Sequence, residues 1–126
     1  MSQIFVIYAP NDESQFERLK TQARTAKLSA EFDGMKVKQP WVEGWKGQCR
    51  TKIYKSDGVI VLISKNTKQG GIEWELTCAR EFDTPMLGIH LDKASGSMVP
   101  DSLRGVEVIE WNWPEIMRFI KSPAPG

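Results

Sequence analysis

Continuous apolar runs alternate along the chain with segments whose apolar residues recur every three or four positions. The runs at 4–9 and 59–63 are unbroken and rich in β-branched residues, which is typical of strands buried on both faces. Less continuous apolar runs predict three further strands, at 30–32, 86–91 and 106–109. The helical spacing between them predicts helices at about 12–29, 41–56, 72–82 and from 113 onward.

This alternation predicts the fold class. Strands that are apolar throughout, separated by helices, indicate a parallel sheet that is covered on both faces. Five such units in 126 residues match a flavodoxin-like, doubly wound α/β domain with strand order 2-1-3-4-5. In these sheets ligands bind beyond the carboxyl ends of the strands, where the order reverses. We therefore expect a site among the loops at 10–12, 33–41 and 64–71.

Composition supports a single domain, which we place at residues 1–121, with a frayed tail at 122–126. Lys plus Arg number 17 and Asp plus Glu 16, so the chain has no general attraction to nucleic acid or anionic lipid. The longest apolar runs are about a third of the roughly 20 residues that a membrane-crossing helix needs. No basic and apolar leader precedes the first strand, and we expect a cytoplasmic protein with Cys49 and Cys78 as free core thiols.

Several chemistries are disfavoured by the loops. No glycine-rich phosphate-binding motif follows a strand, and the loop after the first strand lacks the Ser/Thr-rich character of a flavin site. The strand at 59–63 ends in Ser64 and Lys65, where a phospho-acceptor domain would have an aspartate. The single histidine, His90, has no recognisable nucleophile beside it, and two cysteines do not make a zinc site. We interpret His90 as a structural residue at a strand end.

Glu75 is the remaining candidate for chemistry. Successive helical side chains rotate by about 100°, so Glu75 lies roughly 60° from the centre of the stripe formed by Ile72, Leu76 and Ala79. That position puts a carboxylate at the edge of the buried face, near the carboxyl end of the sheet. An acid favoured by the helix dipole in the first turn explains the same position equally well.

The motifs also resemble those of a known family. The resemblance is carried by residues 4–8 with Asn11 and Asp12, by 56–67, by 73–76 with Ala79, and by 85–91. These stretches resemble the TIR-like domains of bacterial Thoeris anti-phage defence, over nearly the whole chain and most specifically over 56–79. The resemblance implies a flavodoxin-like fold and an enzyme that cleaves the nicotinamide–ribose bond of NAD⁺ and recloses ADP-ribose into a cyclic signal. NAD⁺ is then the substrate, and no cofactor is implied.

The resemblance further implies partners and site residues. A phage-derived trigger would switch the enzyme on, the signal would activate a separate effector, and the domain would self-associate. The family's catalytic glutamate falls on Glu75. We also predict that the substrate is bound from the first loop by Tyr8, Asn11 and Asp12, and stacked from the second loop by Trp41 or Trp45.

These binding residues have structural explanations as well. Tyr8 suits the core at a strand end, Asn11 and Asp12 suit a helix cap, and the two tryptophans suit the packing of a helix on the sheet. Trp74, on the outward side of its helix, suits a subunit contact.

Two departures from the family pattern keep alternatives open. Ile7 precedes Tyr8 where a small serine is common, and Gly71 stands four residues before Glu75 where many TIR enzymes have an aromatic residue. One alternative is a non-catalytic TIR-like interaction module. The other is a nucleoside deoxyribosyltransferase-like enzyme, which also uses an active-site glutamate.

Overall fold

The computed structural model describes residues 1–68, 70–92 and 99–123. Its strands are β1 (Ser2–Ile7), β2 (Ala30–Gly34), β3 (Gly58–Ile63), β4 (Met86–His90) and β5 (Glu107–Glu110). Its helices are α1 (Glu13–Thr25), α2 (Glu43–Lys55), α3 (Gly70–Glu81) and α4 (Trp113–Lys121), with short 3₁₀ turns η1 (Pro10–Asp12) and η3 (Asp101–Leu103).

The strands form one parallel sheet in the order β2-β1-β3-β4-β5. Strand β3 lies at its centre, and Val61 pairs with Ile7 of β1 and Gly88 of β4. Every residue of β3 is buried, because a central strand meets helices on both faces. The sheet confirms the predicted α/β class and the predicted strand order.

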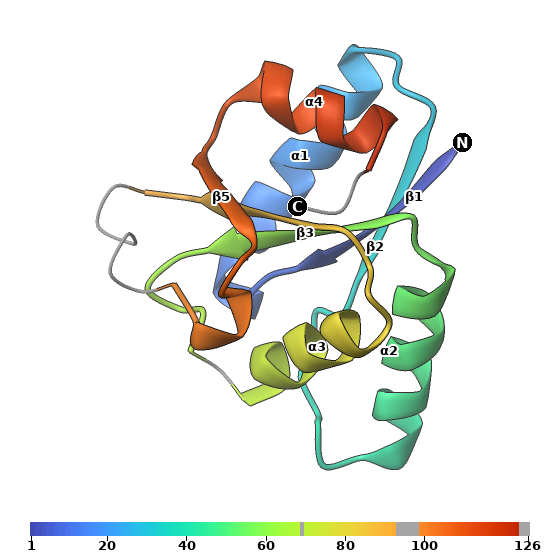
Figure 1. Ribbon diagram of the computed structural model, residues 1–126, viewed down its shortest axis with the longest axis vertical. Helices are drawn as coiled ribbons and strands as arrows, with labels where there is room; N and C mark the ends of the chain where they lie inside the picture. The colour runs from blue at the N-terminus through green and yellow to red at the C-terminus, as the bar shows by residue number, and fades with distance from the viewer. Residues whose placement is uncertain (69, 93–98, 124–126) are drawn as a thin grey trace.

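Two helical layers cover the sheet (Figure 1). Helices α1 and α4 lie on one face, while α2 and α3 lie on the other. Strand β1 shows the resulting alternation: Ile4 and Val6 pack in the core beneath α1 and α4, whereas Phe5 and Ile7 pack in the core beneath α2 and α3. A strand with a core on each side has no polar face, which explains its continuous apolar run.

The end of α1 and the start of α2 differ from the predicted boundaries. Helix α1 ends at Thr25, short of residue 29, and Lys27 adopts a left-handed φ of 56°. Helix α2 begins at Glu43, since Val42 has the extended φ of −107° and ψ of 121°. Trp41 therefore precedes the helix and is 75% exposed, so the interpretation that it packs the helix on the sheet, as Trp45 does, is wrong.

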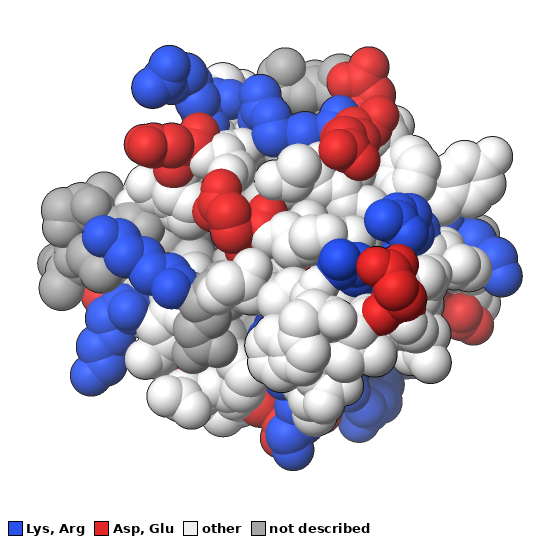
Figure 2. Space-filling model, turned by 90° about the horizontal axis from the view of Figure 1, so that it is seen from below, with Lys and Arg blue, Asp and Glu red and all other residues white. Residues whose placement is uncertain are grey.

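The cysteines and the surface agree with the composition. Cys49 and Cys78 are free and buried in the core beneath α2 and α3. Figure 2 shows Lys and Arg side chains interspersed with Asp and Glu on the face seen from below, in keeping with the balanced net charge. Within the described ranges, no helix combines the length and the apolarity needed to cross a membrane.

The chain end is described only in part. Pro123 is half-buried, and its Cβ would lie 2.9 Å from a Cβ placed on Gly58, so the segment after α4 contacts the start of β3. Residues 124–126 of the predicted tail lie outside the described residues, as do 93–98 of the predicted loop.

Candidate active site

Helix α3 carries Glu75 into the interior at the carboxyl end of the sheet. Ile72, Leu76 and Ala79 form the apolar stripe that docks this helix onto the core, as their spacing predicts. Glu75 lies beside the stripe and is 0% exposed, so it is more deeply buried than a position at the edge of the stripe indicates. A carboxylate without solvent requires a partner.

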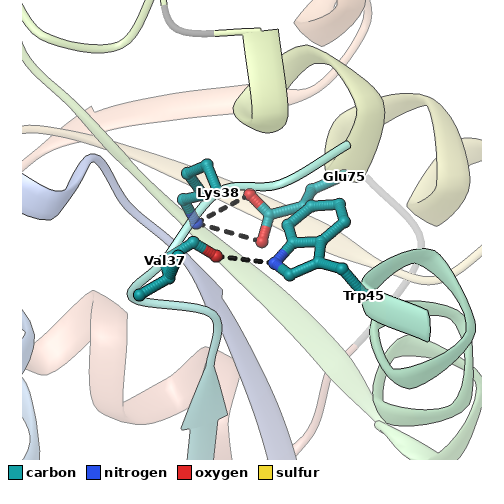
Figure 3. Close-up of polar contacts among 4 residues, drawn as sticks. All are labelled: Val37, Lys38, Trp45 and Glu75. Atoms are coloured by element: carbon teal, nitrogen blue, oxygen red, sulfur yellow. Dashed lines mark hydrogen bonds and ion pairs between the residues drawn. The ribbon is translucent and has the colours of Figure 1, made fainter. Parts of the chain in front are cut away.

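Lys38 is that partner (Figure 3). Its Nζ donates hydrogen bonds to both Glu75 carboxylate oxygens, at 3.1 Å to Oε1 and 2.9 Å to Oε2. The Lys38 side chain is itself only 6% exposed. Lys38 belongs to the segment 35–42 between β2 and α2. Trp45 of α2 holds this segment in place, because its Nε1 donates a hydrogen bond to the carbonyl of Val37, the residue before Lys38, at 2.6 Å. Two elements distant in sequence thus form one buried ion pair.

Burial and pairing act in opposite directions on the Glu75 carboxyl. Loss of water disfavours its charged form and raises its pKa to about 7, although the charge and hydrogen bonds of Lys38 lower it. The group therefore changes protonation near neutral pH. A titratable group perturbed in this way by burial and a specific partner is typical of functional sites.

Gly71 lets the Lys38 stem approach α3. A Cβ on Gly71 would lie 2.5 Å from the Lys38 Cβ and 3.0 Å from its Cγ, distances at which one of the two side chains must move. By contrast, a Cβ on Gly70 would meet nothing within 4 Å. The departure from the family pattern at Gly71 therefore has a steric explanation, because the Lys38 stem occupies the space of a larger side chain.

Tyr8 lies at the end of β1 and completes the surroundings of the ammonium. The Lys38 Nζ is 5.2 Å from the centroid of the Tyr8 ring, and this ring stacks on Phe16 at 4.6 Å. Tyr8 is 3% exposed, and burial, followed by the nearby carboxylates of which Glu13 is the largest contributor, raises its pKa to about 12. Tyr8 is thus both a core residue and a neighbour of the ion pair.

Asp12 joins the loops that follow β1 and β3. It precedes α1 but makes no side-chain cap hydrogen bond, so its interpretation as a helix cap is wrong. Its carboxylate instead accepts hydrogen bonds from Ser64 Oγ at 2.5 Å and Asn66 Nδ2 at 3.3 Å. Its neighbour Asn11 is exposed.

The structure brings only some of the predicted binding residues together. Tyr8 and Trp45 flank the segment that carries Lys38, whereas Trp41 is at the surface. Trp74 is half-buried and meets Trp45 edge to face at 5.5 Å, so its predicted outward position is wrong. Direct contact of any of these residues with a substrate stays a prediction.

Sequence reasoning did not single out Lys38. The segment 34–40 is recognisably basic, but Lys36 and Lys38 have no feature that separates them in the sequence. Lys36 pairs with Glu13 at the surface. A buried acid on α3 signals that some cation must face it, yet only tertiary packing identifies which one.

A cavity of about 760 Å³ lies elsewhere, between α2 and the β1–β2 edge of the sheet. Gln3, Phe5, Asp33, Gly47 and Lys52 are among its lining residues, and Glu75 is not. Among the described residues there is no group of three or more His, Cys, Asp or Glu side chains placed to hold a metal ion.

The sheet order and the two helical layers define a doubly wound α/β domain. A family model described as "Thoeris protein ThsB, TIR-like domain" matches residues 5–96. The chain therefore belongs to this Thoeris TIR-like family. The search of curated proteins finds no match.

Solved structures with the same fold share little sequence with this chain. A prokaryotic SEFIR domain is 18% identical with a TM-score of 0.61, covering 95% of this chain and 99% of that one. The Clostridium botulinum CMP N-glycosidase BcmB is 14% identical with a TM-score of 0.59, covering 94% and 98%. A 3-dehydroquinate dehydratase-like protein from Bifidobacterium longum is 12% identical with a TM-score of 0.56, covering 98% and 95%.

Proposed function

We propose that this domain is an NAD⁺-cleaving enzyme of anti-phage immunity. It breaks the nicotinamide–ribose bond and closes the ADP-ribose into a cyclic signal that activates a separate effector protein. The observation that carries the proposal is the fully buried Glu75 carboxyl, hydrogen-bonded to a cation at the carboxyl edge of the sheet. Membership of the Thoeris TIR-like family supports it.

The chemistry needs a single carboxylate. When the bond between the ribose C1′ and the pyridinium nitrogen breaks, the electron pair goes to the nitrogen and nicotinamide leaves neutral, so no general acid is required. Positive charge grows on the ribose carbon instead. Ionised Glu75 stabilises that charge or holds the ribose hydroxyls, as carboxylates do in glycoside cleavage.

The acceptor decides the product. In cyclisation an atom of the same ADP-ribose bonds to C1′ and releases a proton, whereas in hydrolysis water does so. Cyclisation requires that water be kept out until the ring closes. The complete burial of Glu75 favours this branch, because its surroundings are already dry.

The remaining residues and partners follow the same proposal. Tyr8, Asn11 and Asp12 bind the substrate from the side of β1, and Trp45 or Trp41 stacks on it from the segment before or at the start of α2. A phage-derived trigger and self-association control the activity. Free buried thiols at Cys49 and Cys78 favour the cytoplasm as its location.

The decisive variant is Glu75→Gln, which keeps the shape of the side chain and removes its charge. Purified protein is incubated with NAD⁺, with and without lysate from phage-infected cells, and nicotinamide and nucleotide products are quantified by mass spectrometry. We expect product formation to fall by about 100-fold or more. Glu73→Gln is the matched control, because Glu73 lies on the same helix and is exposed.

Three outcomes would change the assignment. An unchanged rate in Glu75→Gln would exclude Glu75 as the catalytic group. Absence of turnover under every trigger would favour the non-catalytic interaction module. Release of cytosine from CMP, or base exchange between nucleosides, in place of NAD⁺ cleavage would favour a nucleoside-directed enzyme, a class for which the shared fold of the CMP N-glycosidase gives a precedent.

A further inference from the structure

We infer that Lys38 determines the charge of the ligand that this site accepts: its ammonium occupies the position of the substrate's cationic ring, and a ligand must replace it there. The inference rests on the proposed function, since it takes Glu75 as the group that faces the substrate. It adds a specificity-determining residue that the proposed chemistry does not use.

The ammonium lies in a complete cation-binding arrangement. Both Glu75 oxygens accept its protons, at 3.1 and 2.9 Å, and the Tyr8 ring centroid is 5.2 Å from its Nζ. A carboxylate together with an aromatic ring is also a favourable environment for a ligand cation. A pyridinium ring carries the same single charge as the ammonium.

Lys38 and a ligand cannot occupy this position together. Glu75 is 0% exposed and the Lys38 side chain 6% exposed, so no ligand contacts the carboxylate while the ion pair is intact. The Lys38 stem also lies against Gly71, which closes the approach along α3. A lysine side chain is long and unbranched, and its ammonium regains full hydration when it moves to the surface.

Charge then selects the ligand. A cation that replaces Lys38 leaves Glu75 paired, whereas a neutral ligand would leave a buried carboxylate without a partner, which is strongly unfavourable. The site therefore prefers N-ribosylated pyridinium compounds over neutral nicotinamide and neutral nucleosides. Lys38 also lowers the apparent affinity for the cation, because only molecules whose site is vacated bind it.

The test measures binding without turnover. Lys38→Met keeps the length of the side chain and removes its charge. Removal of Lys38 takes away the charge and hydrogen bonds that lower the Glu75 pKa, so calorimetry is run at pH 8 and at pH 9. It compares two probes of similar shape: the N1-methylnicotinamide cation and neutral nicotinamide. We expect Lys38→Met to bind the cation about 10-fold tighter than the parent protein, because the ion pair no longer has to open. We also expect this variant to bind the cation more tightly than nicotinamide, because only the cation pairs with Glu75.

A second variant displaces Lys38 without deleting it. Gly71→Ala places a Cβ where the Lys38 stem lies, whereas the control Gly70→Ala meets nothing within 4 Å. Alanine is favourable in a helix, so both proteins should fold. We expect Gly71→Ala to bind the cation more tightly than the parent, and Gly70→Ala to match the parent.

The outcomes separate this inference from the proposed function. Unchanged or weaker cation binding in both Lys38→Met and Gly71→Ala would overturn the role of Lys38, even if Glu75→Gln abolishes NAD⁺ cleavage. Tighter cation binding that disappears in the double variant Lys38→Met, Glu75→Gln would support it, even if no NAD⁺ cleavage is found. Equal affinity of Lys38→Met for the cation and for neutral nicotinamide would also overturn it, since charge would then not be selected.

Discussion

At the scale of single residues, Glu75 and Lys38 form a buried ion pair. Removing two charges from water is unfavourable, and their mutual attraction offsets that only when the geometry is good. Here Lys38 meets both carboxylate oxygens. A stable fold does not need this pair, because replacing both partners of a buried ion pair by apolar side chains of similar volume is often neutral or stabilising.

The raised pKa of Glu75 gives a stability prediction with a definite sign. Its pKa is about 7 in the folded protein and 4.5 in the reference state, so between these values the folded chain retains a proton that the unfolded chain releases. The free energy of unfolding should fall as pH rises through this window, at up to about 1.4 kcal/mol per pH unit. Below pH 4.5 and above pH 7, the contribution of Glu75 ionisation to the free energy of unfolding no longer changes with pH.

Urea unfolding of the parent and of Glu75→Gln at pH 5 and pH 8 measures this effect. We expect the parent to lose stability relative to the glutamine variant on going to pH 8, while Glu73→Gln follows the parent. If the free energy of unfolding of the parent, minus that of Glu75→Gln, stays the same or increases from pH 5 to pH 8, burial does not dominate the ionisation of Glu75.

At the scale of elements, hydrogen bonds connect the loop after β1 to the loop after β3, at the point where the strand order reverses. Ser64 Oγ donates to Asp12, the Asn66 N–H donates to Ser64 Oγ, and the Ser64 N–H donates to Thr67 Oγ1 at 2.7 Å. Asp12, Ser64 and Thr67 are all buried. This network fixes the loops beside the candidate site without using helix capping.

Ser64→Ala should therefore destabilise the protein by about 1–3 kcal/mol, because it leaves the buried Asp12 carboxylate with one hydrogen-bond donor fewer. The control is Ser14→Ala on α1, an exposed position where a change within about 0.5 kcal/mol is expected. Denaturant unfolding at pH 7 compares the two. Equal stability of both variants would mean that the network does not hold the loops.

At the scale of the whole molecule, one sheet is shared by two cores. The core beneath α1 and α4 contains Leu62, and the core beneath α2 and α3 contains Val61 and Ile63, the residues on either side of it in β3. The two layers consequently depend on the same strand, and we expect them to unfold together rather than in turn.

Leu62→Ala tests this shared dependence. Leu62 is 0% exposed, and its truncation should lower the free energy of unfolding by about 2–5 kcal/mol. Leu91→Ala is the control, since Leu91 packs against the same core but is only half-buried, and it should cost less. Tryptophan fluorescence and far-ultraviolet circular dichroism should give coincident transitions, whereas separate midpoints would show that the layers unfold independently.

The sequence by itself determined the class of fold, because the alternation of strands and helices is a local pattern. The strand order was inferred by matching the size of the chain and this alternation to a flavodoxin-like sheet, and the structure confirms it. The unbroken apolar run of β3 predicts a central strand, and the spacing of Ile72, Leu76 and Ala79 predicts the buried face of α3. Periodicity failed at Trp41, where helical spacing continues in the sequence but the extended backbone at Val42 delays the helix. A hydrophobic pattern contains no information on backbone angles at a single residue.

For the candidate site too, the sequence predicts some features and only the tertiary structure determines the others. The position of Glu75 on one face of a helix is a local property, so the sequence was sufficient to find it. Its complete burial, its pairing with Lys38 and the steric role of Gly71 were decided only by tertiary structure, because Lys38 lies 37 positions away in sequence. Which of two similar lysines reaches a buried acid depends on how the segment after β2 packs against α3, and packing between distant segments leaves no trace in local spacing.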